Sequence, residues 1–310
     1  MAEVGFIGLG HMGNPIAANL QKAGHHLVLH DLSQGAAANL LEQGADWADS
    51  PQAVAERSEV IFTSLPGPPE AEAVAMGPEG IFSGAKPGTV FFDTTSNLPS
   101  MVRRMAAAGQ EKGVTVLDAA VSGGVRGAEQ GTLSVMVGGD RDAFEKYKPL
   151  LDAIGGNVFY LGDVGAGCTV KLINNLLGIA SNQLVYEGVV LGVKAGIDPV
   201  TLYEVINVSS GTRMIQGMRA ILDRDWDDPS FTLELAGKDI SLAVQLGREL
   251  GVPMPVASAA EQNFIRAKGR GLGKKGGGAT LILVEEVAGV EVRTSLSTDS
   301  LPGPGRPAGG

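Results

Sequence analysis

A glycine-rich turn near the amino terminus constrains the fold of this chain more than any other feature. An apolar run at 4–7 leads into the segment Gly8-Leu9-Gly10-His11-Met12-Gly13, and a helical pattern at 15–23 follows. In this G-x-G-x-x-G spacing the first glycine permits a tight turn, the second lets the backbone approach a pyrophosphate, and the third lets helix and strand pack closely. The N–H groups at the helix start attract phosphate. The turn predicts a dinucleotide site formed by Gly8, Gly10, His11, Met12 and Gly13, although such a turn also occurs as a plain connection.

An acidic residue follows where the ribose of a dinucleotide is expected. Asp31 ends the second predicted strand, 27–30, and stands eighteen residues after Gly13. A carboxylate there accepts hydrogen bonds from the ribose hydroxyls of NAD and repels the extra phosphate of NADP. One such charge pair at about 4 Å is worth roughly 4 kcal/mol at a surface-like dielectric. We therefore predict NAD as the cofactor, with NADP less favoured. The alternative is that Asp31 caps a helix starting at 32–34.

Composition excludes several classes of partner. A length of 310 residues fits two domains, and the net charge of −10 without a basic cluster argues against nucleic acid. The single cysteine, Cys168, leaves no internal disulfide and fits a reducing cytoplasm. We expect no signal peptide before Val4 and no apolar stretch long enough to span a membrane. No metal site is expected either, because the histidines lack partners at metal-ligand spacing: His11, His25, His26 and His30.

Short apolar runs alternate with helical patterns up to about residue 163, which predicts a parallel sheet covered by helices on both faces. The predicted strands are 4–7, 27–30, 60–64, 90–93, 115–118, 133–137 and 158–161. The predicted helices between them are 15–23, 34–43, 51–57, 69–76, 100–112 and 141–154.

Ligands of such sheets bind beyond the carboxyl ends of the strands. The segments expected at that edge are the glycine turn, Leu65-Pro66, 94–96 and the turn after Asp118. Leu65, Pro66 and Ser96 are therefore further candidate cofactor contacts.

The second half of the chain shows helical patterns throughout. A long helix over 169–195 is apolar on most sides, which predicts burial. Shorter helices are predicted at 200–208, 213–222, 233–250, 255–268 and 279–288. The predicted organisation is a doubly wound, mostly parallel α/β Rossmann domain at 1–164 and an all-α domain at 165–293. The latter starts with the linking helix 168–195, and a disordered tail rich in Ser, Pro and Gly follows at 294–310.

Lys171 stands one turn into the long helix, with Asn174 and Asn175 on the same face at i+3 and i+4. Burial disfavours the charged form of a lysine, and an amine that titrates closer to neutrality transfers protons well. An asparagine at 175 can hold both the amine and a substrate oxygen without adding charge. The alternative is a lysine at a helix end whose amine reaches water.

Ser122-Gly123-Gly124 follows Asp118 at the ligand edge. The two glycine N–H groups with the serine hydroxyl can form a cradle for a carboxylate, and Arg126 can add positive charge. The alternative is an ordinary loop whose turn Asp118 caps. Lys238-Asp239, taken alone, is typical of solvated surface charge.

Together these segments resemble the β-hydroxyacid dehydrogenase family over about residues 3–293. Four motifs stand in the family's order: the cofactor turn at 6–13, the D-A-P-V-S-G-G substrate loop at 118–124 with Ala120 at the proline position, the G-x-G-x-x-x-K-x-x-N-N segment at 165–175, and Lys238-Asp239. The segment 93–99 is similar to the family's D-x-S-T-x-x-P, with Ser96 at the position that contacts the cofactor.

The resemblance implies reversible hydride transfer between a nicotinamide and a short 3-hydroxy acid or its semialdehyde. It implies that Lys171 is the general acid and base, that Asn175 orients the reacting oxygen, that Ser122, Gly123, Gly124 and Asn174 bind the substrate, and that Lys238 lies near the cofactor. The substrate end is expected near 209–214 and 231–239, where Arg213 can meet a second carboxylate or a sulfonate. Apart from the resemblance, the apolar long helix suggests packing between subunits, so we expect a homodimer or homotetramer in the cytoplasm, without nucleic-acid or membrane partners.

Three alternatives share the architecture. Imine-reducing relatives generally lack the lysine found at 171. A 6-phosphogluconate dehydrogenase has a longer helical region and prefers NADP. A non-catalytic nucleotide-binding module of the same fold would have an altered lysine and a basic arm.

Overall fold

The computed structural model describes residues 3–211, 218–227 and 229–294. Contacts divide the chain into two compact units, Met1–Ile173 and Asn174–Gly310. The helix α9, Ala166–Lys194, begins in the first unit and continues in the second. The domain boundary expected after residue 164 stays a prediction, because the division by contacts falls inside this helix.

Unit 1 is built on one eight-stranded sheet in the order β3-β2-β1-β4-β5-β6-β7-β8. All neighbouring strands run parallel except β6 and β7, which are antiparallel. The direction of strand addition reverses between β1 and β4, which is the position where doubly wound sheets bind dinucleotides. The strands are β1 (Glu3–Ile7), β2 (His26–His30), β3 (Asp46–Trp47), β4 (Val60–Thr63), β5 (Val90–Asp93), β6 (Thr115–Ser122), β7 (Leu133–Gly138) and β8 (Gly155–Tyr160).

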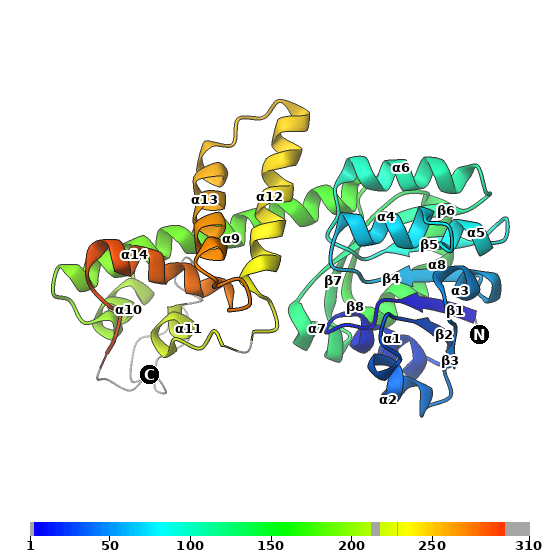
Figure 1. Ribbon diagram of the computed structural model, residues 1–310, viewed down its shortest axis with the longest axis horizontal. Coiled ribbons are helices and arrows are strands. Elements are labelled where there is room, and N and C mark those ends of the chain that lie inside the picture. The colour runs from blue at the N-terminus through cyan, green and yellow to red at the C-terminus, as the bar shows by residue number, and fades with distance from the viewer. Residues whose placement is uncertain (1–2, 212–217, 228, 295–310) are drawn as a thin grey trace. The chain divides into compact units, whose positions relative to one another are not determined.

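Helices cover both faces of this sheet. In Figure 1 the helices α4, α5 and α6 lie above the sheet, and α1 and α2 lie below it. The bounds are α1 (Gly13–Lys22), η1 (Gln34–Ala37), α2 (Ala38–Leu41), α3 (Pro51–Arg57), α4 (Pro68–Met76), α5 (Ile81–Gly84), α6 (Pro99–Gln110), α7 (Gly124–Gln130) and α8 (Arg141–Ile154).

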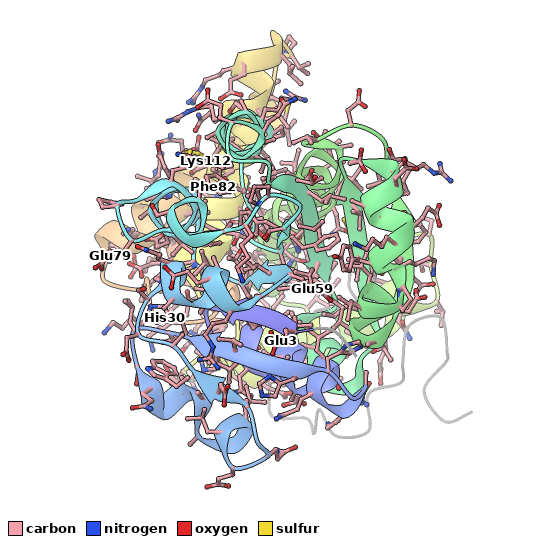
Figure 2. The ribbon with its side chains drawn as sticks, turned by 90° about the vertical axis from the view of Figure 1, so that its right-hand side faces the viewer. Glu3, His30, Glu59, Glu79, Phe82 and Lys112 are labelled. Atoms are coloured by element: carbon pink, nitrogen blue, oxygen red, sulfur yellow. The ribbon has the colours of Figure 1, made fainter. Side chains whose placement is uncertain are left out.

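Successive side chains of a strand point to opposite faces of the sheet, so they pack into two separate hydrophobic cores. Phe6 belongs to the core that contains α1, α2 and α8, whereas its neighbour Ile7 belongs to the core that contains α3 to α6. Both side chains are buried, as expected for strands covered on both faces. Figure 2 views the opposite end of the sheet from the glycine turn, where Glu3 opens β1 and Glu59 donates its N–H to the carbonyl of Glu3 at 3.2 Å.

Unit 2 is helical. Besides its part of α9 it contains α10 (Pro199–Asn207), α11 (Met218–Asp223), α12 (Leu233–Leu250), α13 (Pro255–Gly269), η3 (Gly277–Thr280) and α14 (Leu281–Ala288). One side of α9 enters the core of this unit through Val185, Tyr186, Val189 and Val190. The fold is therefore the predicted Rossmann domain followed by helices.

The expectation that α9 is buried all round is wrong. Leu177, Leu184 and Leu191 are 63%, 64% and 70% exposed. Composition alone does not tell a helix buried on every side from one with a bare apolar face. The expectation that no stretch is long enough for a membrane is also wrong, because α9 qualifies by length and composition, with 28% of its apolar window buried. The uncharged Asn and Gln side chains interrupt the apolar pattern of α9, but they do not lower its mean hydropathy enough to exclude a membrane span by length and composition.

One other local prediction is wrong, and two further observations concern the sheet and the helix predicted at 213–222. β6 continues four residues past Asp118, so 119–122 form a strand rather than a turn, and α7 follows directly. β7 runs antiparallel to β6, a pairing that periodicity along the chain does not reveal. The helix predicted at 213–222 overlaps α11, and its residues 213–217 lie outside the described part, as does the tail from 295 onward.

Candidate active site

Each of the three glycines in the first turn is favoured for a different physical reason. Gly8 has φ of +91°, and a side chain on it would collide with the carbonyl of Ser64, which follows β4. A side chain on Gly13 would collide with the carbonyl of Gly8. A Cβ on Gly10 would meet no protein atom within 4 Å. Protein packing thus explains the first and third glycines, and the open space beside the second fits the pyrophosphate of a dinucleotide.

Asp31 is fixed by two backbone N–H groups at the end of β2. Its Oδ2 accepts from Leu9 in the glycine turn at 2.7 Å, and its Oδ1 accepts from Ser33 at 2.9 Å. Ser33, not Asp31, is the residue that precedes η1, so the helix-cap alternative does not describe this side chain. A carboxylate has about four acceptor positions, so both oxygens retain capacity for ribose hydroxyls.

Leu65, Pro66 and Ser96 follow the carboxyl ends of β4 and β5, and Leu65 lies beside Gly8 of the glycine turn. Leu65 donates its N–H to Thr95 Oγ1 at 3.2 Å, which joins the two loops. Beneath them the buried Asp93 holds the second loop in shape. Its carboxylate accepts from Thr63 Oγ1 (2.9 Å), from Thr95 N (3.1 Å) and from Asn97 Nδ2 (3.0 Å). Burial raises the pKa of Asp93, and these hydrogen bonds oppose the rise.

The Ser122-Gly123-Gly124 segment joins β6 to α7. Gly123 and Gly124 have φ of +137° and +63°, conformations that other residues rarely adopt. A Cβ on Gly124 would meet nothing within 4 Å, so its backbone faces open space. One pocket reaches from Gly10 and His11 of the cofactor turn to Val125 of α7. Successive backbone N–H groups in such a turn can hold an anion.

Asp118 does not cap the turn that follows it; that alternative is wrong. Its side chain is fully buried, and its two oxygens accept from Gly165 N and Cys168 N, both at 2.7 Å. These N–H groups belong to the start of α9, so Asp118 caps a helix that begins about fifty residues later. Desolvation raises the pKa of Asp118, and the two backbone hydrogen bonds oppose the rise.

Lys171 lies in the part of α9 that belongs to unit 1 and is partly buried. Asn174 and Asn175 begin unit 2. Asn175 Nδ2 donates to Asp239 Oδ2 at 2.6 Å, and Asn174 Nδ2 donates to Asn175 Oδ1 at 3.0 Å. Because a carboxylate only accepts, Asp239 fixes which end of the Asn175 amide carries the donors.

Asp239 is the residue that the sequence reasoning undervalued. It is 2% exposed, and its Oδ1 lies 3.0 Å from Lys238 Nζ, so the pair is not a solvated surface charge. The signal was present: Asp239 stands three residues after Ala236 and four before Ala243, both on the buried face of α12. Arg213 lies outside the described residues.

The doubly wound sheet has a glycine turn after β1 with open space at its second glycine, and a fixed carboxylate after β2. This arrangement is typical of one class of protein, the nicotinamide-dependent oxidoreductases. Family models match over residues 3–162, described as the NAD binding domain of 6-phosphogluconate dehydrogenase, and over 165–284, described as NAD-binding of NADP-dependent 3-hydroxyisobutyrate dehydrogenase.

Individual relatives match over nearly the full length. A 2-(hydroxymethyl)glutarate dehydrogenase of Eubacterium barkeri is 41% identical over 94% of this chain and 97% of its own. A 3-hydroxyisobutyrate dehydrogenase of Pseudomonas aeruginosa is 37% identical over 85% of this chain and 91% of its own. The solved Mycobacterium tuberculosis 3-hydroxyisobutyrate dehydrogenase with L-serine superposes with a TM-score of 0.83, at 28% identity, over 92% of this chain and 99% of that one.

The chain belongs to the β-hydroxyacid dehydrogenase family. It is an oxidoreductase that uses NAD for reversible hydride transfer to and from a short 3-hydroxy acid or its semialdehyde.

Proposed function

We propose that Lys171 is the general acid and base of this reaction. The neutral amine accepts the hydroxyl proton during oxidation, and the ammonium returns it during reduction. Proton transfer of this kind contributes about 10²–10⁴ in rate. The observation that carries the proposal is that Cys168, one turn before Lys171, is bound to Asp118, which lies opposite Asp93 at the carboxyl end of β5, in the same unit as the cofactor turn and the Ser122 loop.

The other roles follow from hydrogen-bonding capacity. Ser122, Gly123 and Gly124 bind the substrate carboxylate, and Asn174 contributes from α9. Asn175, whose amide is fixed by Asp239, orients the reacting oxygen with its remaining donor. The bound NAD accepts or supplies the hydride, and the protein contributes orientation and proton transfer.

The residues proposed to hold the cofactor come from the glycine turn, from the ends of β2, β4 and β5, and from α12. Asp31 binds the ribose, and the glycine turn binds the pyrophosphate. The full set is Gly8, Gly10, His11, Met12, Gly13, Asp31, Leu65, Pro66, Ser96 and Lys238. The open space at Gly10 and the fixed orientation of Asp31 support this assignment.

We propose that the substrate is a 3-hydroxy acid with a second carboxylate. We also propose that the enzyme is located in the cytoplasm. The relative that is 41% identical acts, by its name, on 2-(hydroxymethyl)glutarate, whereas relatives at 37% act on 3-hydroxyisobutyrate.

A panel of hydroxy acids tests both the preference for a second carboxylate and the activity on 3-hydroxy acids in general. With NAD in excess, 2-(hydroxymethyl)glutarate should give a kcat/KM at least about tenfold above that of 3-hydroxyisobutyrate, serine and glycerate. 4-Hydroxybutyrate, whose hydroxyl is one carbon further from the carboxylate, is the spacing control. A higher kcat/KM for 3-hydroxyisobutyrate would show that the enzyme does not prefer a substrate with a second carboxylate. Failure of every 3-hydroxy acid to reduce NAD would remove the function.

The exposed face of α9 supports a homodimer or homotetramer. Leu177, Leu184 and Leu191 repeat every seven residues and stay exposed, which is the spacing of a helix-packing seam. The opposite side of the helix is already packed in unit 2. A second copy of this chain, offering the same stripe in a twofold arrangement, would cover it.

Leu184→Glu should therefore lower the molar mass. A glutamate in the middle of the stripe would place a charge in the apolar interface and prevent its burial there. The folded unit should stay intact, because Leu184 is not part of the core. Light scattering should show at least a dimer for the wild type and the 31.9 kDa monomer for the variant. Leu250→Glu, at an equally exposed leucine of α12, is the control and should keep the wild-type mass. A monomeric wild type would contradict the proposal.

A further inference from the structure

The start of α9 is capped by a side chain from another part of the chain. The first N–H groups of a helix have no partner within it, and a Ser, Thr, Asp or Asn just before the helix usually accepts from them. Here the preceding residue is Gly165, which has no side chain. The carboxylate of Asp118 takes over this function through its two hydrogen bonds to Gly165 N and Cys168 N. The sheet and the helix are thus joined at one buried group.

Two glycines make room for this contact. A Cβ on Gly138, the last residue of β7, would lie 2.7 Å from Asp118 Oδ1. A Cβ on Gly167 would lie 2.9 Å from Asp118 Oδ2 and would collide with the carbonyl of Met136. Any side chain at either position would push the helix start away from the sheet. The local sequence is therefore built for close approach of α9 to this carboxylate.

The carboxylate lies between two segments of the proposed substrate site. Ser122 is four residues further along β6, the strand that contains Asp118. Lys171 is three residues beyond Cys168 on α9, about 4.5 Å along the helix axis at 1.5 Å per residue. All of these residues belong to unit 1. Asp118 therefore connects the strand that ends in the carboxylate loop to the helix turn that carries the amine.

We infer that Asp118 is a positioning residue: by holding the first turn of α9 against β6, it sets the distance between Lys171 and the Ser122–Gly124 loop. The inference rests on the proposed role of Lys171. Asp118 touches neither substrate nor cofactor in this account and acts only through the helix. Near-attack geometry is sensitive to such supports, because a shift of about 1 Å can cost about a hundredfold in rate.

The test is a double-mutant cycle of Asp118→Asn and Lys171→Ala. Asparagine keeps the size of the side chain but turns a donor toward one of the two N–H groups. Asp118→Asn should lower kcat at least about tenfold, with KM for the hydroxy acid within about threefold, because the carboxylate loop stays formed. The affinity for NAD, measured by fluorescence titration, should stay within about twofold. Since Asp118 acts through Lys171, the double variant should be no slower than Lys171→Ala, within about threefold.

A control separates positioning from general damage. Asp140 caps α8 in the same unit, where its Oδ1 accepts from Ala143 N at 2.7 Å. Asp140→Asn should keep kcat within about twofold, since this cap uses one oxygen, which asparagine retains, whereas the cap by Asp118 uses both. If Asp118→Asn yields no folded protein, Asp118→Glu replaces it in the cycle, because the longer side chain keeps the charge but moves the carboxylate away from its two hydrogen bonds.

The outcomes distinguish this inference from the proposed function. If Lys171→Ala keeps near wild-type turnover, the role of Lys171 fails, and the inference fails with it. If Lys171→Ala is strongly impaired while the two losses multiply in the double variant, only the positioning role of Asp118 is overturned. An unchanged kcat in Asp118→Asn overturns it as well.

Discussion

Replacing Lys171 with alanine should lower kcat at least about a hundredfold while the protein still binds NAD. The expected loss corresponds to about 3 kcal/mol in the transition state, the lower end of what a general acid and base contributes. The affinity for NAD should change little, because the glycine turn and Asp31 do not involve α9. Steady-state kinetics with the preferred hydroxy acid and a separate titration of NAD binding measure the two quantities.

Lys194→Ala is the matched control for this variant. Lys194 ends the same helix, is exposed, and donates to the carbonyl of Ala288 at 2.6 Å. Its loss should leave turnover within about twofold, as expected for an exposed charge. Turnover of Lys171→Ala within a few-fold of the wild type would rule out the assignment of this amine as the proton carrier.

Elements with strong local signals could be predicted from the sequence almost to the residue. The helix at 51–57 is bounded by Ser50, which accepts from Ala53 N, and by Pro51 in the first turn. The helix at 141–154 starts after Asp140, which caps it in the same way. Such caps act over three residues, so a pattern in the chain contains the whole interaction.

What the sequence could not provide depends on partners far away in the chain. Asp118 meets Gly165 and Cys168 across 47 and 50 positions, and Asn175 meets Asp239 across 64. A pattern at 118–124 therefore predicted a turn, because nothing in it indicates the antiparallel partner β7 that extends β6 to Ser122. The same limit applies to α9, where composition predicted burial but the bare leucine stripe depends on which neighbours are present.

The candidate site shows the same contrast between features with local signals and features that depend on distant contacts. The positions of the glycine turn after β1 and of Asp31 after β2 could be predicted, because both depend on local patterns with a characteristic spacing, while their role in binding the cofactor stays a prediction. Lys238-Asp239 was singled out only through the family resemblance, and its burial follows from the packing of α12. Motifs located these residues, and only the tertiary contacts give the orientation of the Asn175 amide.

Asp31→Asn should reduce the preference for NAD over NADP by about 30- to 100-fold, expressed as the ratio of the two kcat/KM values. If Asp31 binds the ribose as proposed, its carboxylate, which is fixed by Leu9 N and Ser33 N, should repel the 2′-phosphate of NADP. Roughly 4 kcal/mol at 4 Å is an upper value that solvent reduces to about 2–3 kcal/mol, and each 1.4 kcal/mol is a factor of about ten. Asparagine removes the charge and retains one acceptor for Leu9 N, while its NH2 group faces Ser33 N, which affects both cofactors alike and leaves their ratio to the charge. The change in the ratio should therefore combine a gain with NADP and a loss with NAD.

Ionic strength distinguishes repulsion from a distorted pocket. Repulsion between partly exposed charges weakens with salt, since the Debye length falls from about 30 Å at 0.01 M to about 10 Å at 0.1 M. The wild-type ratio should therefore fall as salt rises, whereas the ratio of Asp31→Asn should stay nearly constant. Asp49→Asn, which removes an exposed carboxylate bound to Trp47 Nε1, is the control and should keep the wild-type ratio within about twofold. A ratio that is unchanged in Asp31→Asn would mean that this carboxylate does not set the preference for NAD.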